Sequence, residues 1–503
     1  MSDPGNKRPS PELIVALVGA VGTDLDAVQK QIAVSLSRFG YTNCQPVRVS
    51  ELFSAVTKDP PKAEDERITA GMDAGTELRE KLKRGDAAMG LAVQKITSLR
   101  GSETPLENTA YVIRSLKNPE EVLRLRRTYR HHFVCVGVYT PRQLRVARLA
   151  EQIAHSHGQR TDEKRSTAEA LVRRDEKELG KQFGQNVRDA FPLADFFVNA
   201  SDGMRLTKGV DRLWDIFFGK PSLSPTRDEF GMFHASSAAL RSSALSRQVG
   251  AAICSDDGDV VSLGMNEVPK AGGGHYWCDD DGDARDHVRG HDQNDRTKRT
   301  MARELINQLQ AKDWLKPELA SKAAEDLLAM ARTGDSAIFK DTIFSALTEF
   351  GREVHAEMSA ITSAARLGIP SKGCTMYVTT FPCHNCAKHI IAAGIARLVY
   401  VEPYPKSFAA DFHDDSIAMD SSDASCSRTV NFQAFEGVAP RHYGEWFQWD
   451  NRKNADGSAR AWIPTSAAPR FTDLNFDQSY REREDHFLGQ FLGALRQAGL
   501  LAE

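Results

Sequence analysis

One histidine, one glutamate and two cysteines in the second half of the chain have the types and spacing of a zinc site. His355 and Glu357 are separated by one residue, and Cys383 and Cys386 form a C-x-x-C motif further along. One imidazole and two thiolates supply three protein ligands, which leaves the fourth tetrahedral position of zinc for a water. The pattern therefore predicts a catalytic Zn²⁺ rather than a structural one, with Glu357 reaching the water without binding the metal.

The elements around these residues are predicted to bring the ligands together. A helix is expected from Glu353 to Leu367, a strand from Thr375 to Thr380, and a second helix from His384 to Ala393. His355 and the two cysteines then lie near helix starts. The helix dipole stabilises thiolates at such positions and lowers their pKa, which favours metal binding.

The order H-x-E followed by P-C-x-x-C resembles the signature of the zinc nucleobase deaminases. The resemblance implies that His355, Cys383 and Cys386 bind zinc and that Glu357 is the catalytic acid and base. Zinc would lower the pKa of its water from 15.7 to about 7. Glu357 would carry the proton to N3 of the pyrimidine while hydroxide attacks C4, so that cytosine becomes uracil and ammonia leaves.

The segment before this site resembles the first helix and strand pair of the deoxycytidylate deaminases. Ser246 to Ile253 and Gly264 to Pro269 carry the resemblance, which implies that Asn266 of the G-x-N-x-x-P motif binds the sugar; a turn asparagine is the alternative. Arg247 is expected either to assist at the phosphate or to form a structural salt bridge. Tyr404 is expected to pack on the sugar or base, unless it is a core or rim tyrosine.

The chain of 503 residues has room for two or three domains. A Pro/Gly/Ser-rich break after Phe218 predicts a first domain over 1–219 and a second over 225–445, which contains a polar insertion over 270–350. Residues 446–503 are expected to form a C-terminal extension. The predicted fold class is α/β, with an N-terminal parallel-sheet domain and a C-terminal α/β/α domain like that of the cytidine deaminases.

Apolar runs in the first domain predict buried strands over Leu13 to Val18, His132 to Tyr139 and Asp195 to Asn199, alternating with helices. The domain resembles a degenerate P-loop kinase. A Walker motif starting at Gly19 would need glycine and lysine where Asp24 and Leu25 stand, so phosphoryl transfer is not expected. A tight strand-to-helix turn is favoured, and the alternative is nucleotide binding by Gly19, Gly22 and Thr23.

A kinase-like domain followed by a deaminase with a long insertion resembles the bacterial anti-phage dCTP deaminases, also called antiviral cytidine deaminases. The resemblance implies deamination of dCTP, with dCMP as a second substrate, and depletion of dCTP during phage infection. It also implies restraint by a small inhibitory RNA. The resemblance to the deoxycytidylate deaminases implies a homo-oligomer, with a hexamer as one candidate form. The alternative function is an editing deaminase that acts on RNA or single-stranded DNA.

Composition bounds the other possibilities. The formal charge is −3, with 41% hydrophobic and 26% charged residues, which excludes a membrane protein and a disordered chain. Eight cysteines are too few for a disulfide scaffold. Because the N-terminus has no signal-peptide pattern, the expected location is the cytoplasm, without a membrane contact.

Two further patterns leave alternatives open. Arginines between positions 124 and 148 form a local basic stretch, which indicates either solvated helix faces or an RNA-contacting surface. The insertion holds three histidines and a cysteine that make a second zinc conceivable, although their spacing fits no standard site: His275, Cys278, His287 and His291. A loop that closes over substrate or mediates subunit contacts is favoured there.

Overall fold

A computed structural model describes residues 10–54, 63–102, 104–332, 338–339, 342, 344, 347–402, 407–421, 428–449, 451–470 and 477–501. The chain divides into two compact units, each with a six-stranded sheet. The first unit comprises Met1–Phe233, Val401–Tyr404 and Ala434–Glu503, and the second comprises His234–Tyr400 and Pro405–Gln433. The sequence placed the boundary near 219–225 and treated 446–503 as a separate extension, whereas the structure assigns that extension to the first unit.

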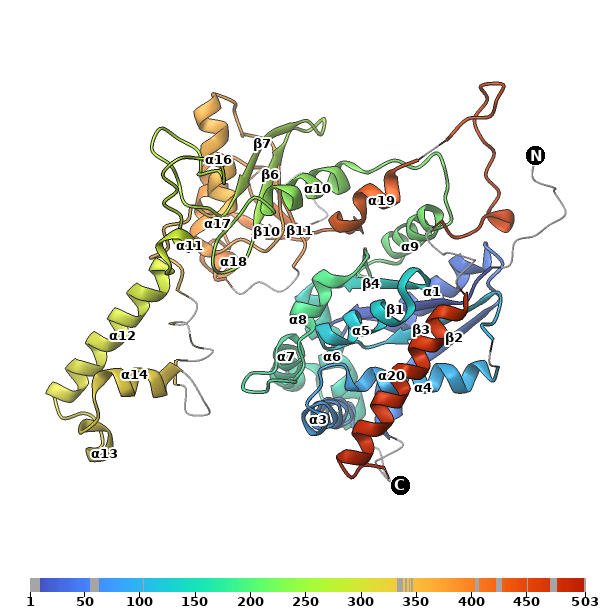
Figure 1. Cartoon of the computed structure of the whole chain (residues 1–503), viewed down its shortest axis with the longest axis horizontal. Helices are drawn as coiled ribbons and strands as arrows, with labels where there is room; N and C mark the ends of the chain where they lie inside the picture. Colours follow the sequence, from blue (N-terminus) through green and yellow to red (C-terminus); the bar gives the residue numbers. More distant parts are fainter. Residues whose placement is uncertain are drawn as a thin grey trace. The chain divides into compact units, whose positions relative to one another are not determined.

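The sheet of the first unit has the strand order β12-β5-β4-β1-β3-β2 (Figure 1). Five strands are parallel, and β12 pairs antiparallel with β5. Their bounds are β1 Leu13–Gly19, β2 Asn43–Arg48, β3 Thr109–Arg114, β4 Phe133–Tyr139, β5 Phe196–Asn199 and β12 Gly437–Val438. The three predicted strands are confirmed, as is the mainly parallel sheet. The resemblance to a P-loop kinase stays a prediction.

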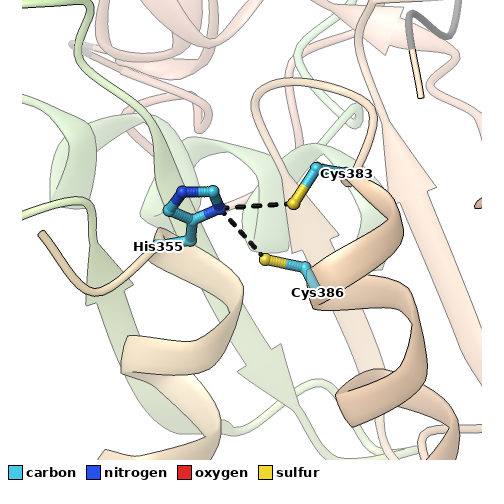
Figure 2. A group of neighbouring side chains, drawn as sticks. All are labelled: His355, Cys383 and Cys386. Carbon is cyan, nitrogen blue, oxygen red and sulfur yellow. Dashed lines mark hydrogen bonds between the residues drawn. The ribbon is translucent and has the colours of Figure 1, made fainter. Parts of the chain in front are cut away.

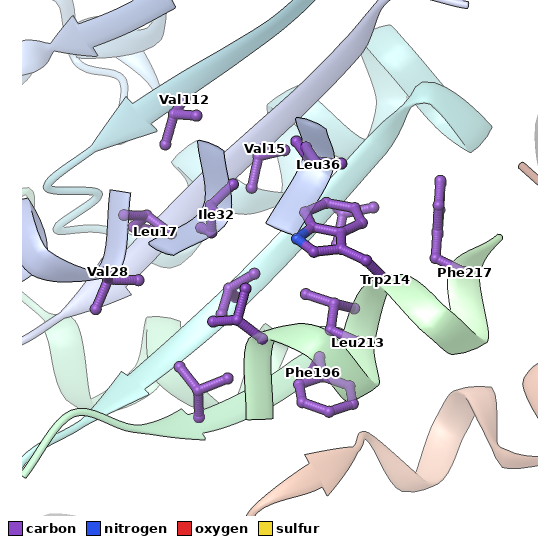
Figure 3. Packing of buried hydrophobic residues seen from close by; sticks show 14 of the residues in the cluster. Val15, Leu17, Val28, Ile32, Leu36, Val112, Phe196, Leu213, Trp214 and Phe217 are labelled. Atoms are coloured by element: carbon purple, nitrogen blue, oxygen red, sulfur yellow. The ribbon is translucent and has the colours of Figure 1, made fainter. Parts of the chain in front are cut away.

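Two helices cover one face of this sheet and form its main core (Figure 3). Helix α1 (Leu25–Ser37) contributes Val28 and Ile32, and helix α9 (Gly203–Phe217) contributes Trp214. Each side chain of this size gains about 1.5–3 kcal/mol from complete burial. This packing fixes the position of the turn that joins β1 to α1.

The charged region over 141–190 forms two long helices that pack against each other through an apolar seam. Helices α6 (Arg142–His157) and α7 (Thr161–Glu176) share Val146, Leu149, Ile153, Leu171 and Val172. The other helices of this half are α2 Val49–Ser54, α3 Glu64–Leu82, α4 Ala87–Arg100, α5 Pro119–Tyr129 and α8 Val187–Ala190.

Several arginines of the basic stretch are engaged inside the first unit. Arg124 pairs with Asp86 at 2.6 Å, Arg126 pairs with Asp195 at 2.6 Å, and the buried Arg145 pairs with Glu176 at 3.2 Å. These contacts favour a structural role for the three side chains over an RNA-contacting one.

The last part of the chain completes the first unit. Helices α19 (Tyr443–Phe447) and α20 (Asp477–Gln497) follow β12, and α20 packs on α4 and α5. Arg100 is buried between two carboxylates, Glu12 at 2.5 Å and Glu484 at 2.9 Å. The first turns of α20 are part of this packing, because Tyr480 and Glu484 are buried as well.

The sheet of the second unit has the order β10-β11-β9-β8-β6-β7. Strands β6 and β7 form an antiparallel hairpin, and β8 is parallel to β9. Their bounds are β6 Gly250–Cys254, β7 Val260–Met265, β8 Thr375–Val378, β9 Arg397–Tyr400, β10 Ile417–Met419 and β11 Val430–Ala434.

Helix α10 runs from Arg227 to Ala239 and ends well before β6. Polar side chains beyond it bind neighbouring backbone and compete with helical hydrogen bonds. Ser242 Oγ donates to the Asn266 carbonyl at 2.7 Å, and Gln248 donates to the Ser242 carbonyl at 2.7 Å.

In the part that the structure describes, the polar insertion contains helices with a small core of Ala302, Ile306, Leu327 and Leu328. The helices are α11 Asp286–Arg289, α12 Gln293–Ala311, α13 Pro317–Ala320 and α14 Ala324–Arg332. Across the described part of the chain, no helix combines the length and the apolar character needed to cross a bilayer.

Candidate active site

Helix α16 (Ala356–Leu367) carries the first ligand and the acidic residue of the site. His355 is its N-cap, and Glu357 lies in its first turn. The helix lies against β7 at Gly264, where a Cβ would stand 2.1 Å from the Ala356 carbonyl oxygen. Only glycine allows this approach, and Ser262 Oγ adds a 2.9 Å hydrogen bond to the Ala360 carbonyl. Strand β7 thereby fixes the helix that presents His355.

Helix α17 (His384–Ala392) carries the two cysteines. Cys383 is its N-cap, and Cys386 is buried in the first turn. Strand β8 ends at Val378 and leads through Phe381 to the helix, and Phe381 packs edge-on against Tyr400. The predicted order of strand, Pro382 and helix is confirmed, and it places both sulfur atoms at a helix N-terminus.

The three predicted ligands meet in space (Figure 2). His355 Nδ1 lies 3.3 Å from Cys383 Sγ and 3.4 Å from Cys386 Sγ. All three donor atoms lie within 4.8 Å of one another. Glu357 is buried beside them, with Oε2 3.4 Å from Cys386 Sγ. One nitrogen and two sulfur donors fit a tetrahedral zinc that keeps one position open.

The metal-free ligands share protons unequally. Hydrogen bonding from Cys386 lowers the pKa of Cys383 to about 4, and hydrogen bonding to Cys383 raises the pKa of His355 to about 9. The pKa of Cys386 is raised by its bond to Cys383 and by burial. Burial, followed by the nearby Cys383 charge, raises the pKa of Glu357. At neutral pH the group therefore holds a thiolate beside an imidazolium, with protons that a metal must displace.

Asn266 lies close to the segment that leads to His355, because its neighbour Glu267 forms an isolated β-bridge with Val354. The Asn266 side chain is engaged within the chain: Oδ1 accepts from Val249 N–H at 2.7 Å, and Nδ2 donates to the Arg247 carbonyl at 2.7 Å. These bonds hold the loop 247–249 in place. A role for Asn266 at the sugar stays a prediction.

The other two predicted substrate residues have different outcomes. Arg247 is exposed and donates through Nη2 to Thr380 Oγ1, at the end of the segment that follows β8. This hydrogen bond ties Arg247 to the same region as the cysteines, and its role at a phosphate stays a prediction. Tyr404 lies outside the described residues.

The remaining predicted residues belong to the first unit and are not part of this group. Gly19 ends β1, and Gly22 and Thr23 lie in the turn before α1. Gly22 has φ +84°, and a Cβ there would meet the Arg145 carbonyl oxygen at 2.6 Å, so the tight turn is confirmed. Among the residues described, His355, Cys383 and Cys386 form the one cluster able to hold a metal; the four insertion residues form none.

Sequence reasoning missed the contacts that orient the ligand helices. Thr380, Glu267 and Ser262 act through hydrogen bonds to residues far away in the sequence. The close approach at Gly264 is the one feature with a visible signal, since a glycine inside a strand often marks a neighbouring backbone.

Residues 225–402 match the sequence profile of the cytidine and deoxycytidylate deaminase zinc-binding region. The His355–Cys383–Cys386 group lies within that match, so the profile and the donor set agree on zinc as the metal.

Known proteins similar to this chain match it over short segments. The deoxycytidylate deaminase of Enterobacteria phage T2 is 41% identical over 92 residues, which is 18% of this chain and 45% of that protein. The human deoxycytidylate deaminase is 35% identical over 78 residues, which is 16% of this chain and 38% of that protein. The chain thus spans less than half the length of these relatives.

Among solved structures, a dCMP deaminase from the cyanophage S-TIM5, in complex with dCMP and dUMP, is 16% identical to this chain. The match covers 42% of this chain and 98% of that one, with a TM-score of 0.23. A TM-score of this size supports no structural conclusion.

Proposed function

We propose that the chain removes the amino group of a deoxycytidine nucleotide by zinc-dependent hydrolysis. The observation that carries the proposal is the buried Glu357 carboxylate beside a His/Cys/Cys donor set, 3.4 Å from Cys386 Sγ. The match to deoxycytidylate deaminases around these residues supports a cytosine nucleotide as the substrate class.

His355, Cys383 and Cys386 would hold the zinc. When bound, zinc supplies a Lewis acid that lowers the pKa of water toward neutrality. Glu357 takes a proton from the attacking water, delivers it to N3, and later protonates the departing amine. The water oxygen forms a bond to C4, the C4–N bond breaks, and ammonia leaves. Burial raises the pKa of Glu357 above its ordinary value, and a raised pKa suits a carboxylate that must both accept and release a proton.

dCTP is the proposed substrate, with dCMP as the second candidate, and depletion of dCTP during phage infection is the proposed role. Both rest on the resemblance of the two-domain arrangement to the anti-phage dCTP deaminases. The small RNA partner, the homo-oligomer and the cytoplasmic location stay predictions.

An editing deaminase is the second candidate because two exposed aromatic rings stand close to the ligand helix. Phe408 and Phe412 stack with centroids 5.2 Å apart, and the Phe412 ring lies 5.7 Å from that of His384. Stacked aromatic side chains are the platform on which single-stranded nucleic acids place their bases.

The test is a substrate panel on the zinc-loaded full chain, freed of bound RNA. Chromatography should detect dUTP from dCTP, or dUMP from dCMP, and sequencing should show unchanged cytidines in RNA and single-stranded DNA. Glu357→Gln should abolish turnover while zinc stays bound, and Glu304→Gln, an exposed change on α12, should retain it. No product from either nucleotide would refute the proposal, and C-to-U changes in polynucleotide would favour the second candidate.

A further inference from the structure

A cavity of about 700 Å³ lies in the first unit, well within the range that holds a small-molecule ligand. Its walls come from the turn Gly19–Asp26, helix α3, the end of β3 at Arg114, and helices α6 and α7. In open parallel sheets, ligands bind in the crevice outside the carboxyl ends of the strands. The cavity occupies that place for β1 and β3, and it shares no residue with the zinc group.

Part of the cavity lining is apolar. Phe53, Ile68, Met72 and Leu149 form this apolar wall, and Gly71 of α3 adds no side chain. A Cβ at Gly71 would meet no atom within 4 Å, so the wall borders open space. Such a surface suits a flat ring, because ligand pockets combine apolar walls with a few fixed polar groups.

Cations and carboxylates also line the cavity, in equal number among the residues described. Arg114 binds Asp26 with both of its terminal nitrogens, at 2.5 and 3.0 Å, and Arg48 binds the same carboxylate at 2.9 Å. Lys117 and Arg148 line the cavity as well. The guanidinium and ammonium groups together form a setting in which an anionic ligand finds several donors.

Several lining residues in this part of the chain, Thr23 and Arg114 included, have a buried polar atom without a hydrogen-bond partner, and two of these atoms are Arg148 Nη1 and Gln185 Oε1. Gln185 is 3% exposed, so its oxygen is shielded from bulk solvent. Buried polar atoms are nearly always hydrogen-bonded in folded proteins. Both atoms therefore point to a ligand that the protein binds at this place.

A carboxylate from the chain occupies the position that a phosphate would take at the turn after β1. Asp175 on α7 is fully buried, and its Oδ2 accepts from Val21 N–H at 2.7 Å. Its Oδ1 lies 2.9 Å from Lys117 Nζ, which also donates to the Gly19 carbonyl at 3.1 Å. A phosphate-binding loop offers the same two kinds of donor, a backbone N–H of a glycine-containing turn and a lysine ammonium. Lys117, from the loop after β3, thus supplies the charge that Leu25 does not.

We propose that this cavity binds a nucleoside phosphate and that Asp175 competes with the phosphate for Val21 N–H and Lys117. The ring would lie on the apolar wall, and the phosphate would take the place of the Asp175 carboxylate. Because two anions cannot share these donors, the ligand binds only when Asp175 leaves them. The wild-type protein therefore binds the nucleotide weakly, and a substitution that removes the Asp175 charge strengthens nucleotide binding.

The test is isothermal titration calorimetry of the full chain with ATP, inorganic pyrophosphate and adenosine. Asp175→Asn keeps an acceptor for Val21 N–H but removes the charge, and it should raise the affinity for ATP at least about tenfold. Lys117→Gln should lower that affinity at least about tenfold. The matched control is Asp73→Asn, which removes an exposed carboxylate that pairs with Arg174 and does not line the cavity; it should change nothing.

Binding of ATP that is tighter than that of pyrophosphate or adenosine, and tightest in Asp175→Asn, supports the proposal. If Asp175→Asn raises the affinity for adenosine as much as that for ATP, the proposed phosphate position is wrong. If pyrophosphate binds as tightly as ATP, the apolar wall has no role in binding. If circular dichroism shows that Asp175→Asn is unfolded, the wild type is compared with Lys117→Gln instead. An affinity for ATP that Lys117→Gln leaves unchanged overturns the proposal. The absence of saturable ATP binding in every folded variant overturns it as well. These outcomes do not depend on deaminase activity.

Discussion

Gly264→Ala tests whether close backbone packing positions the metal ligands. The new Cβ would stand 2.1 Å from the Ala356 carbonyl oxygen and 2.3 Å from Ala360 N. Real Cβ contacts stay beyond 3.0 Å, so β7 and α16 must separate by about 1 Å. Both contacted atoms belong to the backbone of α16, and no side-chain rotation relieves the contact.

Ala356 lies between His355 and Glu357, so the shift moves a ligand and the proton carrier away from the cysteines together. Over-packing of this kind costs about 1–3 kcal/mol of unfolding free energy. A displacement of about 1 Å at a catalytic group costs roughly 100-fold in rate. We expect both effects, together with weaker zinc binding, because His355 Nδ1 leaves the position 3.3 Å from Cys383 Sγ.

The assay combines urea unfolding of the zinc-loaded protein, zinc content measured by mass spectrometry, and the deamination rate. Gly493→Ala is the matched control, because it lies in α20 with no atom within 4 Å of its Cβ position. Alanine there should stabilise the helix by up to about 1 kcal/mol and leave zinc and rate unchanged. Wild-type zinc affinity and rate in Gly264→Ala would refute the positional reasoning.

Three further predictions concern stability and the metal. Asp195→Asn should lower the free energy of unfolding by about 3 kcal/mol at pH 7. Burial raises the pKa of Asp195, but hydrogen bonds and charges from a histidine and two arginines outweigh it and hold the pKa below its ordinary value. The ionised carboxylate therefore stabilises the folded state above about pH 4, and this contribution is lost as the pH falls further. The melting temperatures of the wild type and Asp195→Asn should accordingly converge in acid. Phe491→Ala should lower the free energy of unfolding in urea by about 3–5 kcal/mol, because the buried Phe491 ring fills the space left by Gly90. A decrease below about 1 kcal/mol would mean that α20 is loosely attached. Zinc uptake by metal-free protein at pH 7 should release about two protons, from the His355 imidazolium and the Cys386 thiol, and a pH-stat titration that finds none would contradict the proton distribution.

The sequence predicted the zinc ligands because their chemistry is local. Each ligand lies at a helix start that the pattern marks, and the structure brings His355, Cys383 and Cys386 together as expected. The buried strands were equally visible, since Leu13–Gly19 and Phe133–Tyr139 are apolar throughout and buried on both faces.

Elements with weak apolar signals were missed. Strand β2 reads Asn-Cys-Gln-Pro-Val-Arg and buries only Val47, as befits a strand at the edge of a sheet. Strand β12 has two residues, and its pairing with β5 depends on tertiary context alone. Helix α10 ends before Ser242, whose bond to Asn266 is a contact that no local pattern reveals.

The contacts within the candidate sites are the least predictable part. The two amide bonds of Asn266, the pairing of Arg247 with Thr380, and the meeting of Lys117 with Asp175 all join distant positions. Such pairs follow from how the sheets place their loops, and a single sequence contains no record of that placement.

The second unit is inserted into the first, and this order constrains how a nascent chain can fold. A ribosome releases β1 to β5 and the helices between them well before β12 and α20, which lie beyond the inserted unit. Until then the β5 edge lacks its antiparallel neighbour, and Arg100 lacks the Glu484 carboxylate. Unpaired strand edges invite association between chains. A fragment that ends at 219 would keep that vulnerable state permanently, so excising the N-terminal unit requires stitching its C-terminal segments back onto it.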